Sequence, residues 1–204
     1  MMRRIVAIIA AMAGACALAA IPAGCASPSS HFYTLNAGAA PAATAEAATS
    51  GLVVIVGPVS VPAVVDMPQI VVRTGPNQVS VDEFNRWASP LQSNISHVVA
   101  DNLVAMLGTP RVMLYQQAQN TEGDYRVSID VQTFESAPGE AATLSALWVV
   151  RRVKDGKTRI GRTDVREATP EKSYQALAAG HSRALGRLSE DIANAIRMLD
   201  RGPR

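Results

Sequence analysis

Cysteine is almost absent from this chain, and its absence narrows the chemistry that the protein can perform. The 204 residues contain two cysteines, Cys16 and Cys25, and both lie near the amino terminus. The chain after Cys25 therefore has no disulfide framework, no thiol nucleophile and no cysteine-based metal site. A domain without such cross-links must be held together by its hydrophobic core.

Recognisable catalytic and metal-binding motifs are missing as well. The sequence has no Gly-x-Ser-x-Gly, no phosphate-binding loop, no His-Glu-x-x-His and no metal-spaced carboxylate cluster. Its three histidines, His31, His97 and His181, are far apart in sequence. We interpret His97 as a helix-surface or partly buried residue and His181 as a core or groove-lining residue, with a catalytic base as the alternative. We therefore expect no enzyme, no cofactor and no metal.

The chain has little net charge of either sign, with 19 Lys and Arg against 17 Asp and Glu. Arg3 and Arg4 lie in a segment that we expect to be removed, which leaves 17 basic residues against 17 acidic ones. A neutral domain gives no electrostatic reason to expect a nucleic-acid partner. Arg151, Arg152 and Lys154 are interpreted as a solvated strand end, with acidic lipid headgroups or an acidic partner as the alternative.

Residues 1–24 have the pattern of a lipoprotein signal peptide. Basic residues at the start are followed by an uncharged, alanine-rich run, and Ala23 and Gly24 stand directly before Cys25. Cleavage at this point would leave Cys25 at the new amino terminus, where it would carry acyl chains such as palmitate. Cys25 is therefore the predicted lipidation site.

Two alternatives to this anchor remain open. Cys16 also follows small residues, although cleavage there would cut the apolar run short. The run is also nearly long enough to span a bilayer as an uncleaved helix, but Gly14, Pro22 and many alanines weaken that interpretation. Pro22 also departs from the aliphatic residue that usually stands three positions before the acylated cysteine.

The remainder divides into a tether and one domain. Residues 25–50 form the lipidated amino terminus and a linker of small residues, interrupted by a short strand-like run at His31–Leu35. Residues 51–200 are one domain's length and carry the large apolar side chains. Within this domain, Trp148 is predicted to be core, whereas Trp87 could be either a core lid or part of an interface.

The domain alternates strand-like and helix-like patterns. Apolar or alternating runs predict strands at 52–56, 69–73, 78–81, 112–115, 125–133, 144–150 and 157–165. A cap residue followed by proline begins a helix at Ser89 and another at Thr169. Because each helix has one apolar stripe, the predicted class is α/β of the α+β kind. We expect a mixed, mostly antiparallel sheet with two long amphipathic helices packed on one face.

Several specific runs occur in order along the chain after Cys25. They are Tyr33-Thr34-Leu35, Val56-Gly57-Pro58-Val59-Ser60-Val61-Pro62, Asp66-Met67-Pro68-Gln69-Ile70-Val71-Val72-Arg73, Phe84-Asn85-Arg86-Trp87-Ala88-Ser89-Pro90-Leu91, Ala146-Leu147-Trp148 and Leu188-Ser189-Glu190-Asp191-Ile192-Ala193. On these runs the chain resembles the PqiC/YmbA family of ABC-type transport auxiliary lipoproteins. Met67 is a departure, because the family often has Arg there.

The resemblance implies a non-catalytic lipoprotein of the outer membrane that faces the periplasm. Its implied partners are a mammalian-cell-entry (MCE) domain protein and inner-membrane ABC components, which move lipids between the two membranes. A ring-like homo-oligomer is implied as well. Ala26, in place of Asp, after Cys25 agrees with outer-membrane sorting. The residues that the specific runs suggest for partner binding are Pro68, Arg73, Arg86 and Trp87.

Two other functions compete with this expectation. In the first, the domain is a periplasmic lipid-binding shuttle that holds an acyl chain between its sheet and its helices. In the second, it is an exported hydrolase, which would require a pocket that gathers His181 or His97 with a nucleophile and an acid.

Overall fold

The computed structural model describes residues 28–38, 51–118 and 121–201. The predicted signal peptide, Cys25 and much of the predicted linker lie outside the described residues. The domain boundaries proposed from the sequence therefore remain predictions.

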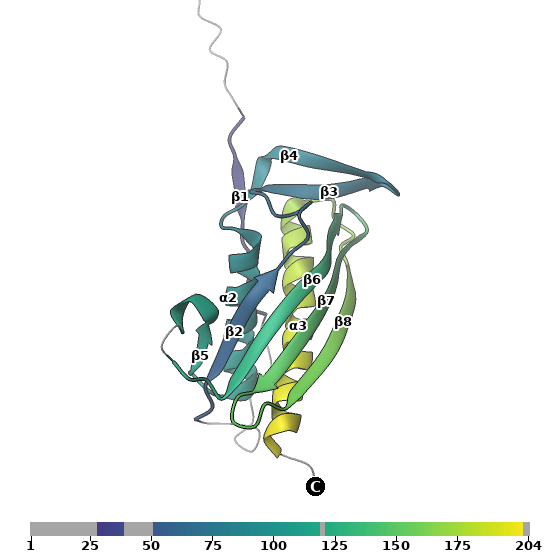
Figure 1. The fold of residues 1–204 in the computed structure, drawn as a ribbon. Helices are drawn as coiled ribbons and strands as arrows, with labels where there is room; N and C mark the ends of the chain where they lie inside the picture. The colour runs from purple at the N-terminus through teal and green to yellow at the C-terminus, as the bar shows by residue number, and fades with distance from the viewer. Residues whose placement is uncertain (1–27, 39–50, 119–120, 202–204) are drawn as a thin grey trace, which may run out of the picture.

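The described chain forms a mixed sheet of eight strands and two α-helices (Figure 1), which confirms the predicted α+β class. The strands and helices follow one another as β1 (His31–Tyr33), β2 (Val54–Ser60), β3 (Gln69–Gly75), β4 (Gln78–Trp87), α2 (Leu91–Leu107), β5 (Val112–Leu114), the 3₁₀ turn η1 (Tyr115–Gln117), β6 (Tyr125–Ala137), β7 (Ala141–Arg152), β8 (Thr158–Ala168) and α3 (Tyr174–Arg201).

Strand β6 is the axis of the sheet. On one edge it pairs antiparallel with β7 along its length, and β7 pairs in the same way with β8. On its other edge it runs parallel first to β2, as far as Asp130, and then to β3 at Ser136. Strand β4 pairs antiparallel with β3, and β1 adds to β4 in parallel.

Both helices cover the same face of the sheet, as Figure 1 shows, and the core lies between these two layers. Alternate residues of β6 point toward the helices and are almost fully buried, among them Val127, Ile129 and Val131. The apolar stripe of α3 meets them with Leu185, Leu188, Ile192 and Ile196. Each such side chain contributes roughly 1.5–3 kcal/mol through burial, which compensates for the missing disulfides.

The first helix begins one residue later than predicted, because Pro90, and not Ser89, is the N-cap residue of α2, and no side chain caps it. The helix ends where Gly108 adopts a left-handed conformation at φ 65°. The Gly108 N–H donates to the carbonyl of Val104 and so satisfies one of the last carbonyls of the helix.

The start predicted for the last helix at Thr169 is wrong, because α3 begins at Tyr174. The Thr169 N–H donates to the carbonyl of Glu140, which holds this residue at the end of the sheet. Ser173 is the residue that caps the helix, since its Oγ accepts a hydrogen bond from the N–H of Ala176.

Two predictions for β7 and the turn after it can be compared with the structure. Trp148 is buried, as expected, and its Nε1 donates to Thr163 Oγ1 at 3.0 Å. Of the predicted solvated strand end, Arg151 and Lys154 are exposed, but the prediction is wrong for Arg152: its side chain is buried, pairs with Asp155 at 2.6 Å and donates to the carbonyl of Leu199. This arginine therefore ties the end of α3 to the β7–β8 turn.

Candidate functional site

The β3–β4 hairpin is the element around which the candidate site is built. It projects from one end of the main sheet, above the start of α3 (Figure 1). Tyr174, the first residue of α3, fixes it there by donating from its hydroxyl to Asp82 Oδ2 at 2.8 Å. Desolvation and this hydrogen bond to Asp82 raise the pKa of Tyr174 to about 12, so the phenol stays a donor.

The base of the hairpin is held by a bulge. Asp82 Oδ1 accepts hydrogen bonds from the backbone N–H groups of Phe84 and Asn85, at 2.8 and 2.9 Å. Although desolvation raises the pKa of this carboxyl, the hydrogen bond from Tyr174 and those from the backbone hold it below its ordinary value. Asp82 is therefore an ionised acceptor that shapes the hairpin.

The two faces of the hairpin differ in what covers them. Ile70 and Val72 point toward the helices and are buried. The opposite face carries Val71 and, on β4, Val79 and Val81, of which the last two are exposed. An exposed valine pair on a projecting hairpin is not needed to stabilise the core.

A gap in strand pairing lies beside this second face. Within the described ranges, no strand pairs with the inner edge of β6 between Asp130, where β2 leaves, and Ser136, where β3 joins. The loop at 61–65 passes this gap without joining the sheet. The sheet is therefore split at this point.

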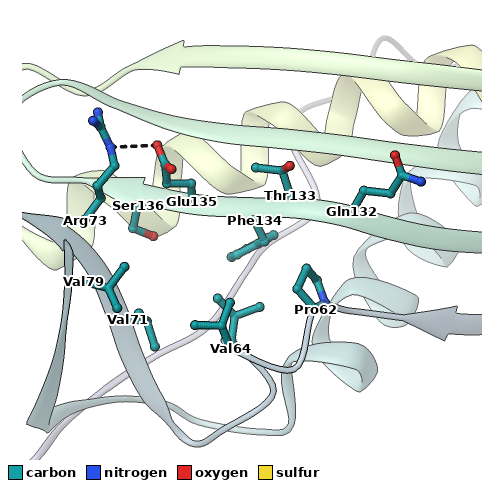
Figure 2. Close-up of a pocket in the computed structure, with 11 residues that line it drawn as sticks. Pro62, Val64, Val71, Arg73, Val79, Gln132, Thr133, Phe134, Glu135 and Ser136 are labelled. Atoms are coloured by element: carbon teal, nitrogen blue, oxygen red, sulfur yellow. Dashed lines mark ion pairs between the residues drawn. The ribbon is translucent and has the colours of Figure 1, made fainter. Parts of the chain in front are cut away.

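A pocket of about 160 Å³ opens at the split. Its walls come from the 61–65 loop, the β3–β4 hairpin and β6, and Figure 2 shows the valines gathered on the side opposite β6. The lining residues are Pro62, Val64, Val65, Val71, Arg73, Val79, Gln132, Thr133, Phe134, Glu135 and Ser136. Six of these residues are apolar and five are polar or charged, and all of the polar ones except Arg73 belong to β6.

Arg73 marks the polar end of the pocket. Its Nε lies 2.9 Å from a carboxylate oxygen of Glu135, the ion pair drawn in Figure 2, and its Nη2 lies 2.7 Å from Glu140. Because the guanidinium fork is held by two carboxylates, its position at the rim is fixed while part of it stays accessible.

The four residues that the sequence suggested for partner binding do not form one surface. Arg73 lines the pocket, whereas Pro68, Arg86 and Trp87 lie at the base of the hairpin. Pro68 is exposed, and its carbonyl accepts the Trp87 N–H at 2.7 Å. Arg86 is half-buried and bonds to Glu83, through both the carbonyl and the carboxylate.

The sequence left two roles open for Trp87, a lid on the core or part of an interface. In the structure it acts as a lid on the core. It is buried, and its ring meets Phe134 edge-on at a centroid distance of 6.1 Å. Trp87 thereby supports the wall of the pocket from behind, without itself lining it.

The pocket valines, Val64 and Val79, were missed by the sequence reasoning. Each is an ordinary residue for a strand or a nearby loop, and only the folded arrangement brings them together. The one available signal was the alternation through Val79 and Val81, because it places both valines on the same face of a short strand.

A buried serine–histidine pair adjoins the pocket, and its serine, Ser136, is one of the lining residues. Ser136 Oγ and His181 Nε2 share a hydrogen bond at 2.9 Å, and the imidazole stacks on Phe134 at a centroid distance of 3.7 Å. Burial lowers the pKa of His181 to about 3. No group in the described part of the chain accepts from or donates to His181 Nδ1.

This pair lacks the geometry of a hydrolase site. A catalytic histidine needs a pKa near the working pH and a group that orients its second nitrogen. His181 has neither among the described residues, and it is fully buried. The pair instead connects β6 to α3 inside the core.

The described residues include no group of three or more His, Cys, Asp or Glu side chains placed to hold a metal ion. Neither α2 nor α3 combines the length and the apolar character that a bilayer crossing requires.

Comparisons with known proteins identify the family. The chain matches the family model of the ABC-type transport auxiliary lipoprotein component over residues 33–193. A comparison with curated proteins finds no match.

Two solved structures have the same fold. A Xanthomonas campestris protein of family DUF330 is 20% identical with a TM-score of 0.68, and the match covers 82% of this chain and 95% of that one. A crystal structure of an uncharacterized protein is 18% identical with a TM-score of 0.67, and the match covers 83% of this chain and 99% of the other. Because the family model covers most of the sequence, and the described fold agrees, the chain belongs to the ABC-type transport auxiliary lipoprotein component family.

Proposed function

We propose that this protein is an outer-membrane lipoprotein that acts as a non-catalytic accessory subunit of an MCE/ABC-type intermembrane lipid transport system. It would be anchored through Cys25 and would face the periplasm. The family match supports the auxiliary role in transport. The outer membrane, the MCE partner, the inner-membrane ABC components and the ring-like homo-oligomer are the finer parts of this proposal.

The observation that carries the proposal is the exposed apolar pocket at the split in the sheet. Val64 and Val79 at its mouth are each 53% exposed. Apolar side chains that are exposed beside a concavity favour a binding surface at that place. For an auxiliary subunit, that binding surface would be the place where the transport partner docks.

The size of the pocket suggests what it would receive. A cavity of about 150 Å³ holds a molecule the size of benzene, and this pocket measures about 160 Å³. It therefore suits one large apolar side chain of a partner, such as Leu, Met or Phe. Arg73, already held by Glu135 and Glu140, would add a hydrogen bond to a carbonyl or carboxylate beside that side chain.

The same size argues against the lipid-shuttle alternative. A long acyl chain is far larger than the pocket, and the pocket opens at the split in the sheet instead of running between sheet and helices. The residues between these layers are packed, with Leu188, Ile192 and Leu103 fully buried. The core would have to open widely to admit a lipid.

The test is a charge placed at the mouth of the pocket. Val79→Asp puts a carboxylate on an exposed hairpin position, where it should leave the fold intact because the side chain is half in water. Ile160→Asp on β8, where the native side chain is 73% exposed, is the matched control. We expect the Val79 variant, and not the control, to lose most co-purification with the MCE-domain protein from cross-linked membranes.

The outcome of this test can also contradict the proposal. If wild-type protein recovers no MCE-domain protein or ABC component, the proposed transport system is wrong. If wild type recovers them and Val79→Asp does so equally well, the function stands and the pocket is not the docking site. Native mass spectrometry of the detergent-extracted protein would show whether it assembles as a ring.

A further inference from the structure

The short strand β1 determines which end of the domain lies near the lipid anchor. It pairs in parallel with the last residues of β4, and the Tyr33 hydroxyl donates to Asn85 Oδ1 at 2.7 Å. The carbonyl of Tyr33 accepts the N–H of Ala88 at 2.8 Å. These contacts hold the start of the described chain against the hairpin end of the molecule.

The chain length before β1 limits how far this end can be from a membrane. Cys25 precedes His31 by six residues, which span at most about 20 Å when fully extended. The opposite end is much more distant, because the 28-residue helix α3 runs about 42 Å away from the hairpin. An acylated Cys25 would therefore keep the hairpin end, and not the opposite end, close to the lipid.

Exposed apolar side chains are concentrated at this same end. Nine large hydrophobic residues are exposed in the described part of the chain, and five of them belong to β1, β4 or the adjacent loop. Two of these, Val64 and Val79, line the pocket. The other three, Phe32 at 66% exposure, Val81 and Phe84, lie outside it on β1 and β4, and we refer to them as the β4 strip.

The register of the strands shows that the side chains of the β4 strip point away from the core. Tyr33 and Trp87 are opposite each other and point inward, so Phe32 and its neighbour Arg86 point outward. Val81 is paired with Val71 on the face that turns away from the helices. Phe84, whose N–H donates to Asp82 at the bulge, is exposed as well.

The charges beside the β4 strip are paired with one another. The Glu83 carboxylate lies 3.4 Å from Arg86 and accepts a hydrogen bond from Gln69 Nε2 at 3.2 Å. Asp82 turns toward Tyr174 on the helix side. An apolar strip with neutralised charges can enter the interfacial layer of a bilayer at low electrostatic cost, and phenylalanine is well suited to that layer.

We propose that the β4 strip contacts the surface of the lipid bilayer in which the protein is anchored, and so orients the domain on the membrane. The proposal rests on acylation of Cys25, as stated in the proposed function. Phe32 and Phe84 would enter the interfacial layer of the bilayer. The domain would then present a constant face to the periplasm.

The scarcity of cysteine provides a clean test. Single cysteines are introduced as Phe32→Cys, Phe84→Cys and, at the far end of the molecule, Ile160→Cys as the matched control. Each full-length lipoprotein is expressed in its host, purified in detergent, labelled with the thiol-specific fluorophore NBD and reconstituted into phosphatidylethanolamine/phosphatidylglycerol vesicles. Emission is then compared with and without lipids that carry a nitroxide quencher near the headgroup.

We expect NBD at Phe32 and Phe84 to emit at shorter wavelength in vesicles and to lose at least half of its intensity to the nitroxide lipid. The label at Ile160 should lose less than a tenth. Equal quenching at all three positions would overturn the proposal. So would a blue shift at Phe84 that the nitroxide lipid does not quench, because that result indicates a contact with protein.

The experiment distinguishes an error in the proposed acylation of Cys25 from an error in the proposed membrane contact of the β4 strip. The wild-type protein should take up no label, because a processed Cys25 has no free thiol and Cys16 has been removed with the signal peptide. Labelling of the wild-type protein would contradict the acylation of Cys25. It would also contradict the membrane contact of the β4 strip, because that proposal depends on the acylation. An unlabelled wild type with unquenched NBD at Phe32 and Phe84 would refute the strip alone.

Discussion

The buried histidine should make this protein sensitive to mild acid, and the size of the effect follows from its surroundings. An imidazole in the unfolded chain binds a proton below about pH 6.5, whereas His181 in the folded protein does so only near a pKa of about 3. Its contribution to stability is therefore fully present above pH 6.5. It declines as the pH falls through that value and continues to decline until the pH reaches about 3.

The loss at pH 5 can be stated in advance. That pH is about 1.5 units below the pKa of the unfolded imidazole, and each unit is worth about 1.36 kcal/mol, so the free energy of unfolding should drop by about 2 kcal/mol. Urea titrations followed by tryptophan fluorescence at pH 7.5 and pH 5.0 would measure this drop. Asp155, whose pKa is lowered to about 2 by its hydrogen bond from Arg152, loses its contribution only below about pH 4 and does not interfere.

A double variant isolates the effect. Ser136→Ala with His181→Leu removes both hydrogen-bonding partners together, so no polar group is left unpaired by the change. We expect this variant to unfold with nearly the same free energy at both pH values. His97→Gln, at an exposed site, should keep the wild-type difference. If the double variant loses as much stability at pH 5 as wild type, His181 is not the group responsible.

Three further outcomes are expected. Gly161→Val should destabilise the fold by about 1–3 kcal/mol, because a Cβ there would lie 2.1 Å from the Trp148 ring. Gly186→Ala, whose Cβ would meet nothing within 4 Å, should be neutral or stabilising, and the midpoints of urea unfolding would show the difference. Arg152→Met should lower the midpoint of thermal unfolding, since it leaves the carbonyl of Leu199 without its arginine partner, and an unchanged midpoint would contradict that role. Cys25→Ser should release the protein from membranes, and normal incorporation of labelled palmitate into this variant would move the lipid to Cys16.

The strands and helices could largely be predicted because their signals are local. The alternation through β6 and β7 and the Asp-Gly turn before β8 need only a few neighbouring residues to take effect. The parallel pairing of β6 with both β2 and β3 could not be predicted, since it joins segments more than 60 residues apart. Nothing in the local pattern specifies such long-range pairing.

The end of β4 was predicted too early, for a different reason. The sequence pattern predicts a strand at 78–81, whereas β4 continues to Trp87. Asp82 explains the difference, because its carboxylate binds two backbone N–H groups and lets the strand continue through a bulge that breaks the alternation. The outward position of Phe84 follows from the same bulge.

The candidate site could be predicted only in part. The family runs drew attention to Arg73, and the structure places this residue at the pocket. The pocket itself is a consequence of where β2 leaves β6 and where β3 joins it. No pattern in the sequence of Val64 or Val79 reveals that they meet across a split sheet.

The pairing of β1 with β4 has a mechanical consequence. If Cys25 is held in one membrane while a partner pulls on the domain from the other side of the periplasm, the tension enters the fold through β1. Since β1 and β4 are parallel, a pull along β1 loads their hydrogen bonds in shear, together with the side-chain link between Tyr33 and Asn85. Bonds loaded together resist force far better than bonds that open one after another. The three paired residues of β1 would thus be the part of the fold that transmits force between the domain and its anchor.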